Sequence, residues 1–269
     1  MSEIYRSFFA LKREPFGADL RIEDLLETAA TRAVPERFLY AVRLGAIGVV
    51  TGEVGSGKST ALRWAAHALH PSEYKPLSLT ATSGAITELY RQIAWSLDLE
   101  INTTSRARLT RAIRSAVIDL VESRKIRPVL IIDEANHLGS EVLAELHVIT
   151  QYRHDSCPML PILLAGQTAL LDRLSLRSVA PLASRVVARS HIDAVSLLDM
   201  TQYLNHHLQI AGVKPTLFSE QATLAIHQGA GGLYRRANHL ARGALIAAAA
   251  ERCQIVSAEH VRIASTELI

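Results

Sequence analysis

A glycine-rich segment constrains the fold of this chain more than any other feature. Residues 52–59 read GEVGSGKS, an apolar run occupies 46–51, and 59–69 repeats apolar side chains at helical spacing. The segment matches GxxxxGK[ST], in which glycines let backbone amides turn toward a phosphate group and a helix N-terminus follows. We therefore predict a strand, a phosphate-binding loop and a helix in this order; the alternative is a structural glycine-rich turn.

The residues of this loop have distinct expected roles. Lys58 would reach the β and γ phosphates of ATP, and Ser59 would bind Mg²⁺. The residues expected to bind the nucleotide are Gly52, Glu53, Val54, Gly55, Ser56, Gly57, Lys58, Ser59 and Thr60.

Two carboxylates follow a later apolar run. Asp133 and Glu134 end VLIIDE, where the carboxyl end of a buried strand is expected and where such sheets bind ligands. We predict that Asp133 holds Mg²⁺ through water and that Glu134 orients and deprotonates the attacking water. A solvated turn is the alternative for this pair.

Further polar residues could complete such a site. Gln167 follows the apolar run 160–166 and could sense the γ-phosphate and position water. Arg185 and Arg189 are spaced i, i+4, which puts them on one side of a helix or extended turn, and one of them could enter a neighbouring subunit's site. Arg235 opens a later helix and could reach the γ-phosphate. Ordinary surface pairing is the alternative for each.

The alternation of strand and helix signals predicts the architecture. Strand-like apolar runs, separated by helical patterns, occupy 46–51, 76–80, 128–133 and 160–166. This order is typical of a three-layer α/β fold with a parallel sheet, and the glycine-rich segment makes a P-loop NTPase domain the expected form of it. Near residue 198 the strand signals stop, and four helical segments follow.

We accordingly predict three parts. Residues 1–45 form an N-terminal segment that packs on the nucleotide site, with two short helices broken at Pro35. Residues 46–197 form the α/β nucleotide-binding domain, and 198–269 form a small all-helical lid.

Composition favours a soluble protein. The longest apolar runs, at 47–50 and 244–250, fall short of the roughly 20 residues that span a bilayer. The N-terminus lacks the order of a secretory signal, and Cys157 and Cys253 are too few for a disulfide framework. We expect no membrane segment, a cytoplasmic location and no metal site at the cysteines.

Together these motifs resemble those of the AAA+ ATPases, and the finer pattern is similar to the ExeA-like branch. The segments that carry the resemblance, in chain order, are YRSFFALKREPFG at 5–17, TGEVGSGKST at 51–60, DEAxxL at 133–138, LLAGQ at 163–167 and GGxxRRxNxL at 231–240. The resemblance covers essentially the whole chain. It implies that Gln167 is sensor 1, that Arg185 is the arginine finger in a helix ending RV, and that Arg235 is sensor 2.

The chain departs from this family at two points. Tyr234 stands where the family usually has proline before the sensor-2 arginine, and DEANHL replaces a commoner DEAH start, so the match gives His137 no role.

Free-standing members of this size resemble the helper ATPases of DDE transposition systems, which assemble on DNA with ATP and direct a transposase to its target. The resemblance thus implies ATP and Mg²⁺ as cofactors, ATPase activity, and three partners: duplex DNA, further copies in a ring or filament, and a DDE transposase. Longer members of the branch act in secretion. A secretion or cell-envelope ATPase acting on protein partners, or an ATP-binding switch with little hydrolysis, therefore stays open.

A basic stretch points to DNA independently of the resemblance. Residues 106–127 contain seven basic and two acidic side chains, a local balance of +5, and part of the stretch forms one basic stripe on a helix. The residues expected to contact DNA phosphates are Thr103, Thr104, Arg106, Arg108, Arg111 and Arg114. Such binding would depend weakly on sequence and strongly on salt. A solvated helix face is the alternative.

Overall fold

The computed structural model describes residues 2–17, 19–153 and 157–266, which divide into two compact units. The α/β unit comprises 29–52 and 58–192. The helical unit comprises the described residues of 1–28, 53–57 and 193–269. The middle of the glycine-rich loop therefore groups with the helical unit, while the loop's ends belong to the α/β unit.

A five-stranded sheet forms the centre of the α/β unit. Its strands have the order β2-β3-β4-β1-β5 and every neighbouring pair is parallel. The strands are β1 (Ile47–Gly52), β2 (Tyr74–Thr80), β3 (Arg127–Asp133), β4 (Ile162–Gly166) and β5 (Val186–Ile192). The predicted parallel sheet is confirmed. The fifth strand is an addition to the four that we predicted.

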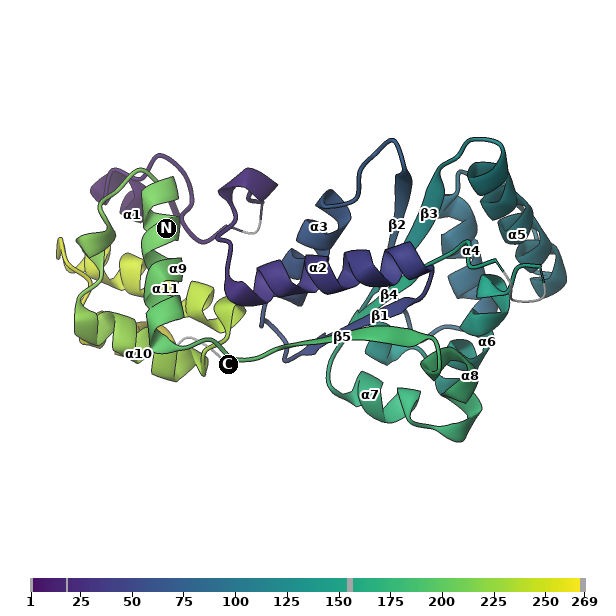
Figure 1. The fold of residues 1–269 in the computed structure, drawn as a ribbon. Helices are drawn as coiled ribbons and strands as arrows, with labels where there is room; N and C mark the ends of the chain where they lie inside the picture. Colours follow the sequence, from purple (N-terminus) through teal and green to yellow (C-terminus); the bar gives the residue numbers. More distant parts are fainter. Residues whose placement is uncertain (1, 18, 154–156, 267–269) are drawn as a thin grey trace. The chain divides into compact units, whose positions relative to one another are not determined.

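Helices cover both faces of this sheet, as a three-layer fold requires (Figure 1). On one face, α2 (Ala29–Leu44) and α3 (Lys58–His67) pack against Val50, Ile131 and Leu163. The other face, with Val49, Leu130 and Leu164, is covered by α4 (Ile86–Ser96), α5 (Arg106–Glu122), α6 (Ser140–Thr150), α7 (Ala169–Leu174) and α8 (Ala180–Ala183). The 3-10 turns of the unit are η2 (Ala135–His137) and η3 (Arg177–Val179).

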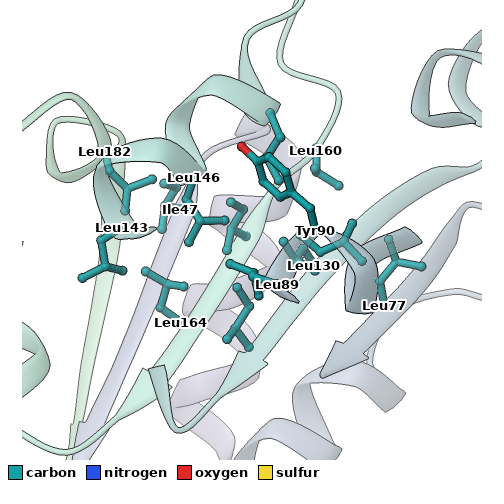
Figure 2. Packing of buried hydrophobic residues seen from close by; sticks show 14 of the residues in the cluster. Ile47, Leu77, Leu89, Tyr90, Leu130, Leu143, Leu146, Leu160, Leu164 and Leu182 are labelled. Carbon is teal, nitrogen blue, oxygen red and sulfur yellow. The ribbon is translucent and has the colours of Figure 1, made fainter. Parts of the chain in front are cut away.

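The larger core of the α/β unit lies on this second face. Figure 2 shows Leu130 and Leu164 of the sheet close to Leu89 of α4 and Leu146 of α6. Because successive strand residues point to opposite faces, strands buried on both sides read as unbroken apolar runs.

The prediction that Pro35 separates two short helices is wrong. Helix α2 continues through Pro35 from Ala29 to Leu44. Val34, Phe38 and Val42, on either side of the proline along the helix, are all buried in one cluster. Burial of this apolar stripe outweighs the local cost of about 3 kcal/mol that proline imposes inside a helix.

The helical unit contains the four predicted C-terminal helices, α9 (Leu197–Ile210), α10 (Glu220–Ala230), α11 (Tyr234–Ala250) and α12 (Ala258–Thr266). It also contains α1 (Ser2–Phe8) and the 3-10 turns η1 (Ile22–Asp24) and η4 (Pro215–Leu217). Their shared core is rich in alanine and leucine.

The N-terminal segment belongs to this same core. Tyr5, Phe9 and Phe16 are buried with the C-terminal helices. Arg242 of α11 donates from Nε to Glu14 Oε1 at 2.7 Å and from Nη2 to the carbonyl oxygen of Phe16 at 2.8 Å. The predicted domain bounds, and the packing of residues 1–45 on the nucleotide site, stay predictions.

Among the described residues, no helix is long and apolar enough to cross a membrane.

Candidate nucleotide-binding site

The glycine-rich loop has the backbone conformation that a phosphate cradle requires. Gly55 has φ +85° and Gly57 has φ +102°, values that residues with a Cβ rarely adopt. Between them, the Ser56 N–H donates to the Glu53 carbonyl oxygen at 3.1 Å and closes a tight turn. The loop thus joins the end of β1 to the first residue of α3 with glycine at each position of positive φ.

Lys58 and Ser59 lie at the start of α3, where the loop ends. The Lys58 side chain is buried, and its Nζ donates to the carbonyl oxygen of Gly52 at 2.9 Å. The Ser59 Oγ donates to Asp133 Oδ2 at 3.0 Å. A hydroxyl and a carboxylate oxygen side by side are the hard ligands that Mg²⁺ prefers, so these residues fit the predicted ion.

The two carboxylates at the end of β3 are held differently. Asp133 is the last residue of the strand, level with Thr80 of β2. Its Oδ1 accepts the N–H of Glu134 at 2.8 Å, and Glu134 adopts left-handed backbone angles of φ 53° and ψ 33°. Glu134 Oε2 lies 3.9 Å from His137 Nε2. The chain turns sharply at Glu134, and the two carboxylates have different neighbours.

Gln167 follows β4 at the same edge of the sheet, since the carboxyl ends of parallel strands lie together. Its backbone N–H donates to the side-chain Oδ1 of Asn136 at 2.9 Å. Sequence reasoning did not single out Asn136. The available signal was Gly166, because a strand-end glycine indicates close approach of another part of the chain.

The i, i+4 spacing of Arg185 and Arg189 predicts a helix or an extended turn. The helix is wrong. Helix α8 ends at Ala183, Arg185 lies in the turn that follows, and Arg189 lies inside β5. The segment forms a strand because Ala188, Ser190 and Ile192 alternate as buried residues with exposed ones.

The position of Arg185 separates it from the other predicted residues of its own α/β unit. Its carbonyl oxygen accepts the N–H of Ile47, the first residue of β1. Asp133 is the last residue of β3, and Lys58 begins α3 after the carboxyl end of β1. One strand of about seven residues spans roughly 20 Å, so Arg185 lies at the opposite edge of the sheet.

Arg235 contacts the loop within the helical unit. Its backbone N–H donates to the Gly55 carbonyl oxygen at 3.2 Å, and a Cβ at Gly55 would lie 2.7 Å from the Cβ of Arg235. The neighbouring Tyr234 ring lies against Gly57 and 4.4 Å, between ring centroids, from Tyr203. Burial raises the pKa of Tyr234 to about 12, so its hydroxyl stays protonated.

The basic residues of α5 fall into two groups. Arg108 and Arg111 are exposed. Arg106 forms an ion pair with Glu145 of α6, and Arg114 donates to the Gln151 carbonyl oxygen and lies 5.3 Å from the Tyr152 ring centroid. Arg106, Arg111 and Arg114 line a shallow groove of about 630 Å³ together with Ala107, Thr110, Ser115 and Ile118.

The two threonines before α5 lie outside this groove. Thr103 Oγ1 accepts the N–H of Ser105 at 3.2 Å, and Thr104 is exposed.

Another polar cluster lies in the helical unit. Ligand atoms of Glu251, Cys253 and His260 lie within 4.8 Å of one another. However, His260 Nδ1 accepts the backbone N–H of Ser257 at 2.9 Å, so the ring proton sits on Nε2 and is shared with Glu251 at 3.1 Å. A metal would need the lone pair of that nitrogen, and the arrangement therefore fits a helix cap better than a metal site.

Comparison with known proteins agrees with this geometry. A family model described as an AAA domain matches residues 42–174. The chain is 28% identical over 267 residues to general secretion pathway protein A of Aeromonas hydrophila, covering 98% of this chain and 48% of that protein. It is 26% identical over 133 residues to the ATP-dependent target DNA activator B of Escherichia phage Mu, covering 47% of this chain and 38% of that protein. The chain thus spans about half, or less, of these curated relatives.

Solved structures share the fold. The Aeropyrum pernix ORC1 protein in complex with DNA superposes with a TM-score of 0.71 at 19% identity, over 96% of this chain and 69% of that one.

Proposed function

We propose that this chain binds ATP with Mg²⁺ and hydrolyses it to ADP and phosphate, because residues 42–174 match a family model described as an AAA domain. The observation that carries the proposal is the hydrogen bond of 3.0 Å between Ser59 Oγ and Asp133 Oδ2. It joins the two motifs, distant in sequence, that P-loop enzymes use to hold the metal.

Each residue of the site would perform a separate task. The loop amides from Glu53 to Thr60 would bind phosphate oxygens, and Lys58 would exchange its bond to Gly52 for one to the β and γ phosphates. Ser59 and Asp133 would hold Mg²⁺, which supplies charge neutralisation at the phosphates. Glu134 would orient the attacking water and accept its proton, and Gln167 would help to position that water.

Two arginines would complete the site. Arg235 is proposed as the residue that reports the nucleotide to the helical unit, and its bond to Gly55 supports this. Arg185 is proposed to act on the site of a neighbouring copy. Its place at the opposite edge of its own sheet supports action between copies in a ring or filament.

We propose further that ATP-driven assembly occurs on duplex DNA and serves to recruit or regulate a DDE transposase. The likeness to an ATP-dependent target DNA activator and the exposed Arg108 and Arg111 support a DNA partner. These arginines would contact the phosphate backbone.

The test is assembly on DNA. Electron microscopy and gel shifts on a duplex of mixed sequence are expected to show ordered oligomers with a slowly hydrolysed ATP analogue and none with ADP. Monomers that bind DNA in neither nucleotide state, even at low salt, would contradict the DNA proposal while leaving ATP binding intact.

A second candidate function is a secretion or cell-envelope ATPase acting on protein partners. The observation that favours it is the likeness to general secretion pathway protein A over 98% of this chain. The neighbouring reading frames discriminate, because an integrase-fold transposase favours the first candidate and secretion genes favour the second. An ATP-dependent switch with little hydrolysis is the third, and for it Glu134→Gln would leave the cellular phenotype unchanged.

A further inference from the structure

The ends of β3 and β4 are joined by a side chain rather than by strand pairing. The register of these strands pairs Leu130 with Ile162 and continues to Ile132 with Leu164. Beyond that point, Asn136 Oδ1 accepts the backbone N–H of Gln167 at 2.9 Å. This bond therefore continues the connection between the two strands past the end of their ladder.

The fit around Asn136 is close. Its side chain is almost fully buried, with 9% of the residue exposed. A Cβ on Gly166 would lie 2.6 Å from Asn136 Oδ1 and 3.0 Å from its backbone nitrogen. Only glycine at 166 permits this approach, and a buried amide oxygen without its donor would be costly.

Asn136 is also part of the turn that carries Glu134. The turn η2 begins after Glu134, whose N–H is bound to Asp133 and whose carbonyl oxygen accepts the His137 N–H at 2.9 Å. At its far end, the carbonyl oxygen of the buried Leu138 accepts a bond from Arg173 of α7. Because the far end of the turn is held at Leu138 and Glu134 is hydrogen-bonded to His137 within the turn, a shift of Asn136 should be passed to the backbone at Glu134.

We infer that Asn136 is a positioning residue for ATP hydrolysis: its bond to the Gln167 backbone sets Glu134 relative to Gln167 at the water-attack position. The inference rests on the proposed function of this site. The bonds of Lys58 to Gly52 and of Ser59 to Asp133 do not involve Asn136. Loss of Asn136 should therefore lower kcat and leave nucleotide affinity nearly unchanged.

The experiment compares three variants with the wild-type protein. N136L keeps the size of the side chain but removes the acceptor oxygen, and N136D keeps an acceptor oxygen in place. T150V is the matched control, because Thr150, the last residue of α6, is also a buried polar residue, and its hydroxyl donates to the His147 carbonyl oxygen. Steady-state kinetics gives kcat and KM, titration with a fluorescent ATP analogue and Mg²⁺ gives affinity, and thermal unfolding gives Tm.

We expect N136L to lose at least about tenfold in kcat, since a displacement near 1 Å can cost about 100-fold. Its affinity for the analogue should stay within about twofold of wild type. N136D should recover part of the lost kcat, and T150V should keep wild-type kcat even if its Tm falls. Should N136L fail to fold, G166A provides the same test from the other side of the bond, with the same expected loss of kcat.

Three results from the variants would overturn the inference alone. The first is a wild-type kcat in N136L. The second is a parallel loss of kcat and affinity in N136L, which indicates a purely structural role. The third is a loss of kcat in T150V equal to that in N136L. A wild-type protein that binds ATP without hydrolysing it overturns the proposed function, and this inference with it.

Discussion

Ser59 Oγ donates a hydrogen bond of 3.0 Å to Asp133 Oδ2 across 74 residues of sequence. The bond brings the first turn of α3 to the end of β3, so that the Ser59 hydroxyl and the Asp133 carboxylate lie side by side. We propose that this pair holds Mg²⁺. Substitution of Ser59 or of Asp133 should then weaken nucleotide binding only when Mg²⁺ is present.

Ser59→Ala and Asp133→Asn should each weaken binding of ATP in the presence of Mg²⁺ by about tenfold, because the first removes a hydroxyl ligand and the second removes the negative charge that holds the hydrated ion. Titration of a fluorescent ATP analogue with Mg²⁺ measures this. The same titration in EDTA is the internal control, in which the variants and wild type should bind alike. Wild-type affinity of Ser59→Ala with Mg²⁺ would contradict the assignment.

Gly55→Ala should destabilise the loop. Gly55 has φ +85°, and the new Cβ would lie 2.7 Å from the Cβ of Arg235. Left-handed backbone costs about 1–2 kcal/mol for a residue with a Cβ, and the clash adds to it. Gly139→Ala is the matched control, since its Cβ would meet nothing within 4 Å. Chemical unfolding should show the larger loss for Gly55→Ala, and ATP affinity should fall for that variant alone.

How far could the sequence alone lead to this site? Strands β1, β3 and β4 were predictable because they are buried on both faces, and such strands appear as continuous apolar runs. Strand β5 was missed because it is an edge strand in which Arg189 and His191 alternate with buried residues, and the i, i+4 spacing of its arginines also fits a helix.

Helix α2 shows a different limit. Pro35 indicates a break from local rules, yet the burial of Val34 and Phe38 decides the outcome, and that burial depends on strands far along the chain. The bond from Gln167 to Asn136 is likewise tertiary, because it links residues 31 positions apart through one side-chain oxygen. A motif match places Asp133 and Glu134, but not the neighbour that holds their turn.

The stability of the protein should depend on pH through His207. Burial lowers the pKa of this histidine to about 4, although its Nδ1 donates to the Pro15 carbonyl oxygen. Because the unfolded chain keeps a pKa near 6.5, it binds more protons than the folded state below that pH. The stabilising effect of the neutral ring is present above about pH 6.5 and is lost as the pH falls through about 4.

Over this range the loss amounts to roughly 3 kcal/mol. Urea unfolding between pH 7 and pH 4 measures it. His207→Gln should lower the free energy of unfolding at pH 7 and make it depend less on pH. The control is His239→Gln, at an exposed position of α11, which should keep the pH dependence of the wild-type protein. An equal pH slope in wild type and His207→Gln would show that another group is responsible.

The arginines of α5 should separate into structural and DNA-binding residues. Arg114→Ala should cost about 1–2 kcal/mol of unfolding free energy, because it removes the bond to Gln151 and the contact with the Tyr152 ring. Arg111→Glu, at an exposed position, should change stability by less than about 0.5 kcal/mol.

Although Arg111→Glu should hardly change stability, it should clearly weaken DNA binding. The charge reversal should weaken DNA binding by the same factor on every sequence. It should also reduce the slope of log K against log salt by about the amount expected for one phosphate contact. Fluorescence anisotropy at several salt concentrations measures both quantities. If Arg111→Glu binds DNA as wild type does, the α5 surface is not the contact.

A mixing experiment tests whether Arg185 acts between copies. Arg185→Ala should bind ATP normally and hydrolyse it at least about tenfold more slowly, because an arginine finger stabilises charge only in the transition state. Lys58→Ala should be inactive for lack of phosphate binding, yet it still carries Arg185. In mixed oligomers, Lys58→Ala subunits would supply Arg185 to the intact sites of Arg185→Ala subunits. The mixture should therefore hydrolyse ATP faster than the two variants measured separately. The same mixture can be made with Arg189→Ala in place of Arg185→Ala. If ATP hydrolysis recovers in that mixture and not in the one with Arg185→Ala, the role belongs to Arg189.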